Sequence, residues 1–429
     1  MKLKNLNRVV ILIMWLFTAF SCNGNENEPK LSIVELKLEK SSIVLEENET
    51  VSIKITSGNG SYKSSTSPTG IVSTHVKYNV IDITALKIGS TTLTVTDTKE
   101  KSATIAIEVE TIPPVDPDAD GKFSLAIYPD TQTEVYAHNY SLFVDRSEWI
   151  VSQRDALDIR GVLHIGDVVN WDDAPVREVW SPDDDHRQFV FAALGLQPLR
   201  DAGIPTSLSI GNHDTMATGG DNGGSARDTR YTYEYQRMTE SFNYYLDDAE
   251  LIPTWKAFED EKVDNGYWTF EAAGVKWLAL NIELWPHTAV TNWAKGVIEA
   301  NPDRNVIIQS HNIFNGSCNI DGAGQDRERW QYGDNSPQRL WNQLVEPYTN
   351  VKIVTSGHTG NECANVFTTA NGNKIIGTLQ NNANGRDYNP VRILEINVND
   401  GTAVTYHYAT RDNSTKGHKE LTGLTFIKE

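Results

Sequence analysis

Acidic, amide and imidazole side chains follow five separate strand-like segments of this 429-residue sequence. In open α/β sheets, residues just after the carboxyl ends of several strands can converge on one ligand. Glycines at 166, 211 and 357 would let the backbone turn sharply and approach an ion. We therefore expect the five groups to form a single site. They are Pro129-Asp130-Thr131-Gln132, Gly166-Asp167-Val168-Val169-Asn170, Gly211-Asn212-His213-Asp214, Ser310-His311-Asn312 and Gly357-His358-Thr359.

The residue types in these groups are suited to bind metal ions. Carboxylate, amide and imidazole groups supply the oxygen and nitrogen ligands that suit Mn, Fe or Zn in a hydrolytic site. Two cations bridged by Asp167 would clamp a phosphate and lower the pKa of a bound water that acts as the nucleophile. His213 is predicted to be an acid or charge stabiliser, and Asp214 is predicted to orient it through a hydrogen bond. The pattern predicts hydrolysis of a phosphate mono- or diester.

The ordered set resembles the calcineurin-like metallophosphoesterases, whose pattern is D-x-H, GDxx(D/N), GNH(D/E), a single H and then GHxH. The resemblance covers roughly residues 122–379, and GDxxN followed by GNHD and two strand-end histidines is a specific signal. It implies an α/β fold with a four-layer β-sandwich flanked by helices, and two divalent metal ions. It assigns Asp130, Gln132 and Asp167 to the first ion, and Asp167, Asn212, His311 and His358 to the second.

Two positions depart from the family pattern, and both affect the first ion. Gln132 stands where the family usually has His, and Gly360 stands where the last His of GHxH would be. The Asp-Thr-Gln form resembles that of exported bacterial members, so Gln132 is predicted to be an oxygen ligand. An oxygen-rich first site favours Mn, Mg or Ca over Zn. Four residues are alternatives for completing it: Asn170, His138, Asn361 and Glu362.

Other side chains near the motifs have two interpretations. His164 lies inside an apolar strand and is expected to be a core residue. Trp171 and the run Trp285-Pro286-His287 follow strands on the side of the site and could stack on a sugar or base. Arg227 and Arg230 lie in a Gly-rich segment, where they either neutralise a phosphate or remain solvated. The candidate substrate contacts are therefore Arg227, Arg230 and Asn170.

The chain divides by pattern into two domains. Residues 31–110 carry short alternating strands without helical periodicity, which predicts a β-sandwich. The segment Ala85–Thr96 resembles the end of a bacterial Ig-like group 2 domain. A linker with three prolines is expected over 111–120. Residues 121–429 alternate apolar strands with longer segments, as in a layered α/β fold, and a helix is expected over Tyr140–Ile159. A terminal set of antiparallel strands is expected at Ile375–Leu379, Val391–Val398 and Ala403–Tyr408.

The N-terminus predicts export. Lys2, Lys4 and Arg8 precede an apolar run, Val9–Phe20, that is too short to span a bilayer. Cys22 follows it and resembles the lipidated first residue of a bacterial lipoprotein, so residues 1–22 are expected to be the signal peptide. Anchoring to the outer membrane, on its periplasmic or outer side, is the expectation; a simple cleavage site with an incidental cysteine is the alternative.

The remaining cysteines, Cys318 and Cys363, each follow a predicted ligand histidine within a few residues. If those histidines converge, the cysteines are near each other, and an exported chain can oxidise them. We expect a disulfide, with two buried thiols as the alternative.

The amino-acid composition limits the classes of ligand that the protein is expected to bind. A net charge of -19 argues against a nucleic-acid-binding surface, but bound cations still permit a small phosphorylated substrate. The membrane is contacted only through the predicted anchor. Two rival functions remain: a metal-binding module that has lost turnover through its weakened first site, and a surface adhesin that works through the Ig-like domain.

Overall fold

The computed structural model describes most of the chain and divides it into two compact units, with the boundary between Val115 and Asp116. The predictions on Cys22, His138, Arg227, Arg230 and Asn361 lie outside the described residues. The described residues are 33–110, 118–136, 140–172, 181, 183–215, 238–247, 252–322, 324, 328–330, 332–359, 362–380 and 388–428.

The N-terminal unit is built from two four-stranded sheets, with strand orders β1-β3-β6-β5 and β2-β8-β7-β4. Apolar side chains alternate along the strands, so one face of each sheet contributes to a shared core that includes Ile53, Ile83, Leu93 and Ile105. The strands are β1 (Lys37–Leu38), β2 (Ser42–Glu46), β3 (Thr50–Ser57), β4 (Lys63–Ser67), β5 (Val72–Lys77), β6 (Val80–Ala85), β7 (Gly89–Thr96) and β8 (Ser102–Glu110).

The larger unit contains two mixed sheets. In the first, order β11-β10-β9-β21-β22-β23, the strands β9 to β11 are parallel and β21 to β23 are antiparallel. Its strands are β9 (Lys122–Tyr128), β10 (Ile159–His164), β11 (Thr206–Leu208), β21 (Pro390–Asn397), β22 (Thr402–Ala409) and β23 (Ser414–Thr422).

The second sheet has the order β12-β13-β14-β15-β18-β20-β19, with β14, β15, β18 and β20 parallel. Its strands are β12 (Lys256–Ala257), β13 (Gly266–Ala272), β14 (Val275–Asn281), β15 (Asn305–Gln309), β18 (Val351–Ser356), β19 (Cys363–Thr368) and β20 (Lys374–Leu379). A separate hairpin joins β16 (Glu328–Trp330) to β17 (Gly333–Asn335).

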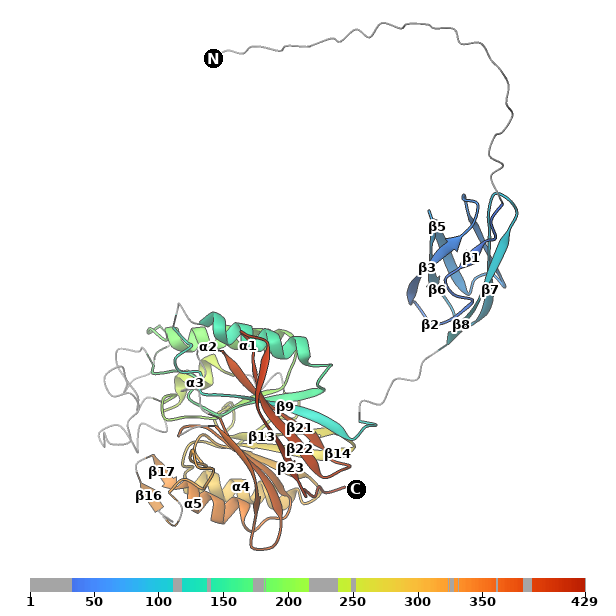
Figure 1. The fold of residues 1–429 in the computed structure, drawn as a ribbon. Coiled ribbons are helices and arrows are strands. Elements are labelled where there is room, and N and C mark those ends of the chain that lie inside the picture. The colour runs from blue at the N-terminus through green and yellow to red at the C-terminus, as the bar shows by residue number, and fades with distance from the viewer. Residues whose placement is uncertain are drawn as a thin grey trace, which may run out of the picture. The chain divides into compact units, whose positions relative to one another are not determined.

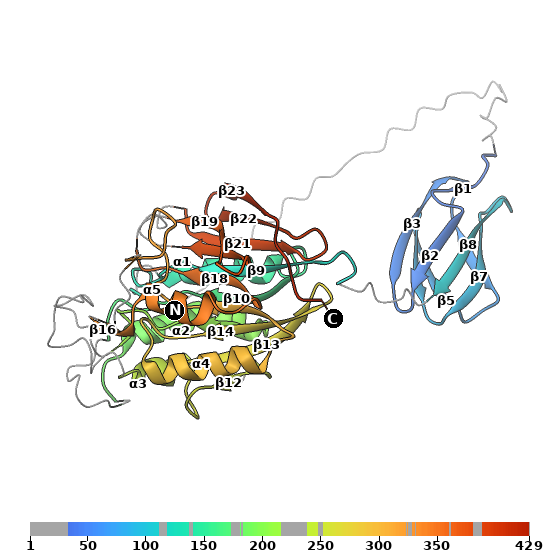
Figure 2. The ribbon, with the colours of Figure 1, turned by 90° about the horizontal axis from the view of Figure 1, so that it is seen from below.

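Helices cover the outer face of each sheet, which gives four layers. Figures 1 and 2 show α1 and α2 beside the sheet that contains β9, and α4 and α5 beside the sheet that contains β14. The helices are α1 (Tyr140–Gln153), α2 (Arg187–Asp201), α3 (Glu240–Tyr245), α4 (Thr288–Ala300), α5 (Pro337–Leu340) and the π-helix η3 (Trp341–Val345). Among the helices of the described ranges, none is both long and apolar enough to cross a lipid bilayer.

Separate apolar clusters fill the spaces between these layers. Leu125, Trp277 and Ile353 belong to the cluster between the two sheets, whereas Phe143 of α1 and Ala294 of α4 belong to two other clusters. Central strands therefore bury both faces and have nearly continuous apolar sequences rather than alternating ones. This arrangement holds the ends of the parallel strands of both sheets in fixed positions.

The predicted four-layer α/β fold is confirmed, with differences in detail. Ile375–Leu379 was expected in a terminal antiparallel set, but β20 lies in the second sheet and pairs in parallel with β18. Its apolar sequence is the same in either setting, so local pattern does not reveal its partner. The helix expected to reach Ile159 ends at Gln153, because Ile159 begins β10.

Candidate metal centre

The first motif follows β9 and presents two buried oxygen atoms. Asp130 is 3% exposed, and its Oδ1 atom has no hydrogen-bond partner in the described part of the chain. The same holds for the Oε1 atom of Gln132. A buried polar atom without a partner costs about 1–3 kcal/mol. Asp130 and Gln132 are separated by a single residue, and their two oxygen atoms are suited to bind one cation, because Ca, Mg and Mn sites prefer oxygen ligands.

Thr131, between these two residues, fixes the motif to β10. Its Oγ1 donates to the carbonyl of Val168 at 3.0 Å and lies 2.9 Å from Nε2 of His164. The Nδ1 atom of His164 accepts the backbone N–H of Gly166 at 3.2 Å. Burial lowers the pKa of His164 to about 3, so the ring is neutral. The expectation that His164 is a satisfied core residue is confirmed.

Asp167 follows β10 and lies at the centre of the cluster. Its Oδ1 accepts the backbone N–H of His213 at 3.0 Å, and its Oδ2 lies 3.2 Å from Nε2 of His311. Burial alone would raise the pKa of Asp167, but the charges of His311 and His213 bring it below its usual range. A Cβ atom at Gly211 would lie 2.1 Å from Oδ1 of Asp167, so only glycine permits this approach.

The two strand-end histidines meet Asp167 in a compact group. Ligand atoms of Asp167, His311 and His358 all lie within 4.8 Å of one another. His311 Nδ1 donates to the carbonyl of Ile165 at 2.7 Å, so Nε2 is the atom that faces Asp167, and it lies 3.2 Å from Nδ1 of His358. A hydrogen bond of this kind fixes the tautomer of a metal-binding histidine.

The two imidazoles have opposite electrostatic settings. Burial lowers the pKa of His311, but the charge of Asp167 outweighs this and raises it to about 9. Burial, together with the charge of His311, lowers the pKa of His358 to about 3. Within the group of Asp167, His311 and His358, the extra proton is therefore held by His311. A divalent cation bound by these side chains would replace that proton.

Asp130 belongs to the same site. A Cβ atom at Gly357 would lie 2.6 Å from Oδ1 of Asp130, which places the His358 loop against the first motif. Burial holds the pKa of Asp130 well above its usual range, His311 opposes the rise, and the negative charge of Asp167 adds to it. The structure thus brings the first, second, fourth and fifth motifs together.

The third motif follows β11, and Asn212 within it is 4% exposed. His213 Nδ1 donates to the carbonyl of Asn170 at 2.7 Å. Both oxygens of Asp214 accept backbone N–H groups, from Val169 at 3.0 Å and from Gly211 at 2.8 Å. The prediction that Asp214 orients His213 is therefore wrong, because the Asn170 carbonyl does so.

Asp214 instead joins the second and third motifs through those two backbone contacts. Burial, with the negative charge of Asp167 added, raises the pKa of the Asp214 carboxyl to about 7. It is a positioning residue for the two loops rather than the orienting partner of the histidine.

Two of the alternatives for completing the first site have other described partners. Asn170 Nδ2 donates to the hydroxyl of Tyr136 at 2.7 Å. Glu362 pairs with Nδ1 of His407, and this contact lowers the pKa of the carboxyl.

The contacts of the aromatic residues near the site differ in part from those that the sequence predicted. Trp285 is only 8% exposed, and its Nε1 donates to Oδ1 of Asn312 at 2.9 Å, so it supports the His311 loop and is not available to stack on a substrate. Trp171 is partly exposed and meets Tyr136 edge to face, with ring centroids 6.1 Å apart. Tyr332 contacts His358 at 5.6 Å between centroids, and sequence reasoning did not identify it.

Two further contacts hold the site loops. Cys318 and Cys363 form the expected disulfide, with their Cα atoms 5.7 Å apart, and it ties the loop after His311 to β19. Glu134 forms a buried bidentate ion pair with Arg146 of α1. The Nη1 and Nη2 atoms of Arg146 lie 2.7 and 2.8 Å from the two carboxylate oxygens. Sequence reasoning missed this ion pair, because twelve residues separate its members and no motif links them.

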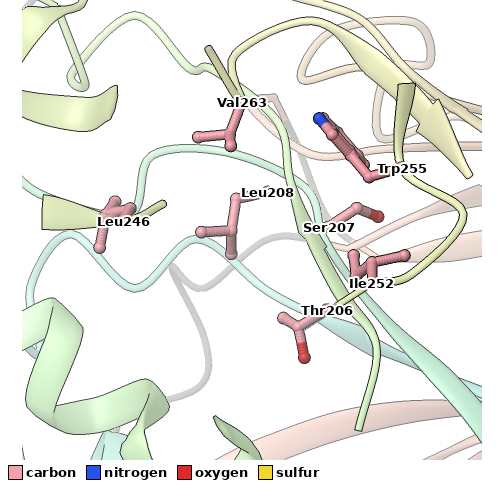
Figure 3. Close-up of a pocket in the computed structure, with 7 residues that line it drawn as sticks. All are labelled: Thr206, Ser207, Leu208, Leu246, Ile252, Trp255 and Val263. Atoms are coloured by element: carbon pink, nitrogen blue, oxygen red, sulfur yellow. The ribbon is translucent and has the colours of Figure 1, made fainter. Parts of the chain in front are cut away.

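A small apolar cavity lies elsewhere in the larger unit. Figure 3 shows its lining, which includes Leu208, Trp255 and Val263, and its volume is about 10 Å³. That volume is enough for about one water molecule. This cavity is too small to hold a phosphate ester.

Comparison with known proteins agrees with this geometry. Residues 126–362, more than half of the chain, match the family described as calcineurin-like phosphoesterase. The uncharacterized protein YvnB of Bacillus subtilis (strain 168) is 25% identical over 243 residues, which is 56% of this chain but 16% of that protein.

The solved structures that match this chain are distant in sequence. A dimetal phosphatase from Danio rerio is 11% identical with a TM-score of 0.40, and 70% of this chain covers 98% of it. GAP50, the anchor in the inner membrane complex of Plasmodium, is 12% identical with a TM-score of 0.38, and 72% of this chain covers 90% of it. The family match covers all five motifs in full and extends past His358, so this chain belongs to the calcineurin-like phosphoesterases.

Proposed function

We propose that this protein hydrolyses a phosphate mono- or diester with two divalent cations, outside the cytoplasm. The observation that carries the proposal is the group formed by Asp167, His311 and His358, together with two buried oxygens, of Asp130 and Gln132, that have no hydrogen-bond partner among the described residues. A small phosphorylated substrate follows from the family, because its members cleave phosphate esters.

Each side chain has a defined part in this proposal. Asp130 and Gln132 would hold the first ion, Asn212, His311 and His358 would hold the second, and Asp167 would contribute to both. The ions would supply a water of lowered pKa and neutralise the phosphate charge. The protein prepares this arrangement, since the Ile165 carbonyl already directs Nε2 of His311 toward Asp167.

His213 is proposed as the acid that assists the leaving oxygen. Its Nδ1 atom is held by the carbonyl of Asn170, so Nε2 is the atom free to give a proton to the alcohol that departs. Its charge also acts on Asp167, which places it beside the proposed ions. The proton remains on the leaving alcohol, and a water proton restores the imidazolium.

The two ion positions are proposed to differ in metal preference. The first has only oxygen ligands among the assigned residues, so it favours Mn, Mg or Ca. The second has two imidazoles and suits Mn, Fe or Zn. Arg227, Arg230 and Asn170 remain proposed substrate contacts.

Export with a lipid anchor at Cys22 is proposed for the location. The disulfide between Cys318 and Cys363 supports it, because such bonds persist in oxidising compartments. Mass spectrometry of the mature N-terminus would test the anchor: an unmodified Cys22, or an intact residue 1, would contradict it.

The test of function combines metal analysis with a substrate panel. The Mn-loaded protein is expected to cleave at least one substrate among chromogenic monoesters, cyclic nucleotides and phosphodiesters, and His213→Ala and Asp167→Asn are expected to lose that activity. Absence of cleavage across the panel by protein that contains two ions per chain would overturn the proposal.

A second candidate function rests on the two departures from the family pattern. With Gln132 and Gly360 in place of histidines, the chain could bind one ion and a ligand without turnover. One tightly held ion per chain, with inactivity in excess Mn, would favour this binding function over hydrolysis.

A further inference from the structure

The aromatic ring of Tyr332 lies beside His358, one of the proposed ion ligands. Its ring is perpendicular to that of His358, with centroids 5.6 Å apart. It also meets Trp285 edge to face at 5.9 Å, and the residue remains partly exposed. The ring is therefore packed against two other rings, and the residue keeps partial exposure next to a proposed ion ligand.

The turn that carries Tyr332 is held rigidly. A Cβ atom at Gly333 would lie 1.9 Å from the carbonyl oxygen of Trp285, so glycine permits the backbone to pack directly on the segment before α4. Asp334 Oδ2 accepts the backbone N–H and the hydroxyl of Thr288 at 2.9 and 3.0 Å. These contacts fix the residues that follow Tyr332 to the N-terminus of α4.

Asn335 also holds the turn that carries Tyr332. Asn335 Nδ2 donates to the carbonyl of Pro286 at 2.7 Å and to Oγ1 of Thr291 at 3.0 Å. The backbone that directly follows Tyr332 is thus held in place before any ligand arrives. A preordered side chain loses little conformational entropy on binding, which makes its contacts with a ligand more favourable.

We propose that Tyr332 determines specificity by contacting a planar aromatic ring on the alcohol side of the phosphate ester. This inference rests on the proposed function, because it takes the phosphate to lie at ions bound by His358. A group esterified to that phosphate would extend toward the rim where Tyr332 lies. A neutral ring adds no charge for the phosphate, but it offers an aromatic surface that pairs with another ring at centroid distances of about 4.5–7 Å.

The test compares two non-hydrolysable ligands, phenylphosphonate and methylphosphonate, by calorimetric titration of the Mn-loaded full chain. The wild type is expected to bind phenylphosphonate more tightly. Tyr332→Ala should weaken phenylphosphonate binding about three- to tenfold and leave methylphosphonate binding unchanged. Tyr332→Phe should retain the preference. Tyr78→Ala is the matched control, because Tyr78 is 85% exposed in the N-terminal unit.

The outcomes separate this inference from the proposed function. Equal affinity of the wild type for both phosphonates would overturn the inference and leave the proposed function standing. Equal weakening of both ligands in Tyr332→Ala, with loss of Mn, would also overturn it, because Tyr332 would then only position His358. If neither phosphonate bound the wild type with two ions present, the proposed function would fail as well.

Discussion

The two halves of the metal centre share Asp167 but are stabilised in different ways. In the imidazole half, the His311 ring is fixed by the Ile165 carbonyl, and the backbone N–H of Gly357 donates to the carbonyl of His311 at 2.8 Å. In the oxygen half, buried oxygens of Asp130 and Gln132 have no described hydrogen-bond partner. The difference teaches that the protein alone holds the imidazole half in place, whereas the oxygen half would be completed by the proposed ion.

The largest effect is expected when the residue common to both halves is changed. Asp167→Asn removes a negative charge next to both ions and should lower kcat/KM by at least about 10³-fold, because metal-assisted stabilisation amounts to several kcal/mol. Metal analysis should show loss of ions from both positions. Asp303→Asn, at an exposed surface position, is the control. Two retained ions in Asp167→Asn would contradict the bridging role.

A change at His213 should separate proton transfer from ion binding. His213→Ala is expected to reduce kcat by about 10²–10⁴-fold, the usual contribution of a general acid, with both ions retained. Steady-state kinetics and metal content measured on the same preparation check this, with His75→Ala as the control. Loss of an ion would show instead that His213 is a ligand.

An imidazole in the oxygen half should make the two halves more alike. Gln132→His supplies a nitrogen ligand where the family has one, so Zn affinity at the first position should rise about tenfold relative to Mn. Dialysis against equal concentrations of Mn and Zn, followed by metal analysis, measures the shift. Gln197→His on α2 is the control. An unchanged metal ratio would mean that residue 132 does not bind the first ion.

The smallest effect concerns stability without metal. Asp130→Asn removes a buried carboxylate beside Asp167, so the free energy of unfolding in EDTA should increase by about 1–3 kcal/mol. In excess Mn the same change should be destabilising, because a ligand is lost. Denaturant unfolding in both conditions, with Asp145→Asn as the control, checks the sign. Equal effects with and without Mn would argue against an ion at Asp130.

Sequence reasoning identified side chains that the structure brings together, but not the contacts that hold them. Asp130, Asp167 and His311 could be found because ligand-type side chains directly follow apolar strands, and this pattern is local. The ion pair of Glu134 with Arg146 and the placement of Tyr332 depend on packing between distant segments. The same limit applies to β20, whose sheet is decided by its neighbour β18 rather than by its own residues.

The disulfide has a consequence for how quickly an ion can leave. It links Cys318 in the loop after His311 to Cys363 after His358, across 45 residues. Neither loop can open widely unless the other moves with it, so the escape of a coordinated ion requires a concerted excursion of both. Such an excursion is rarer than the fraying of a single loop. The dissociation rate of the second ion should therefore be slow in the oxidised protein and faster after reduction.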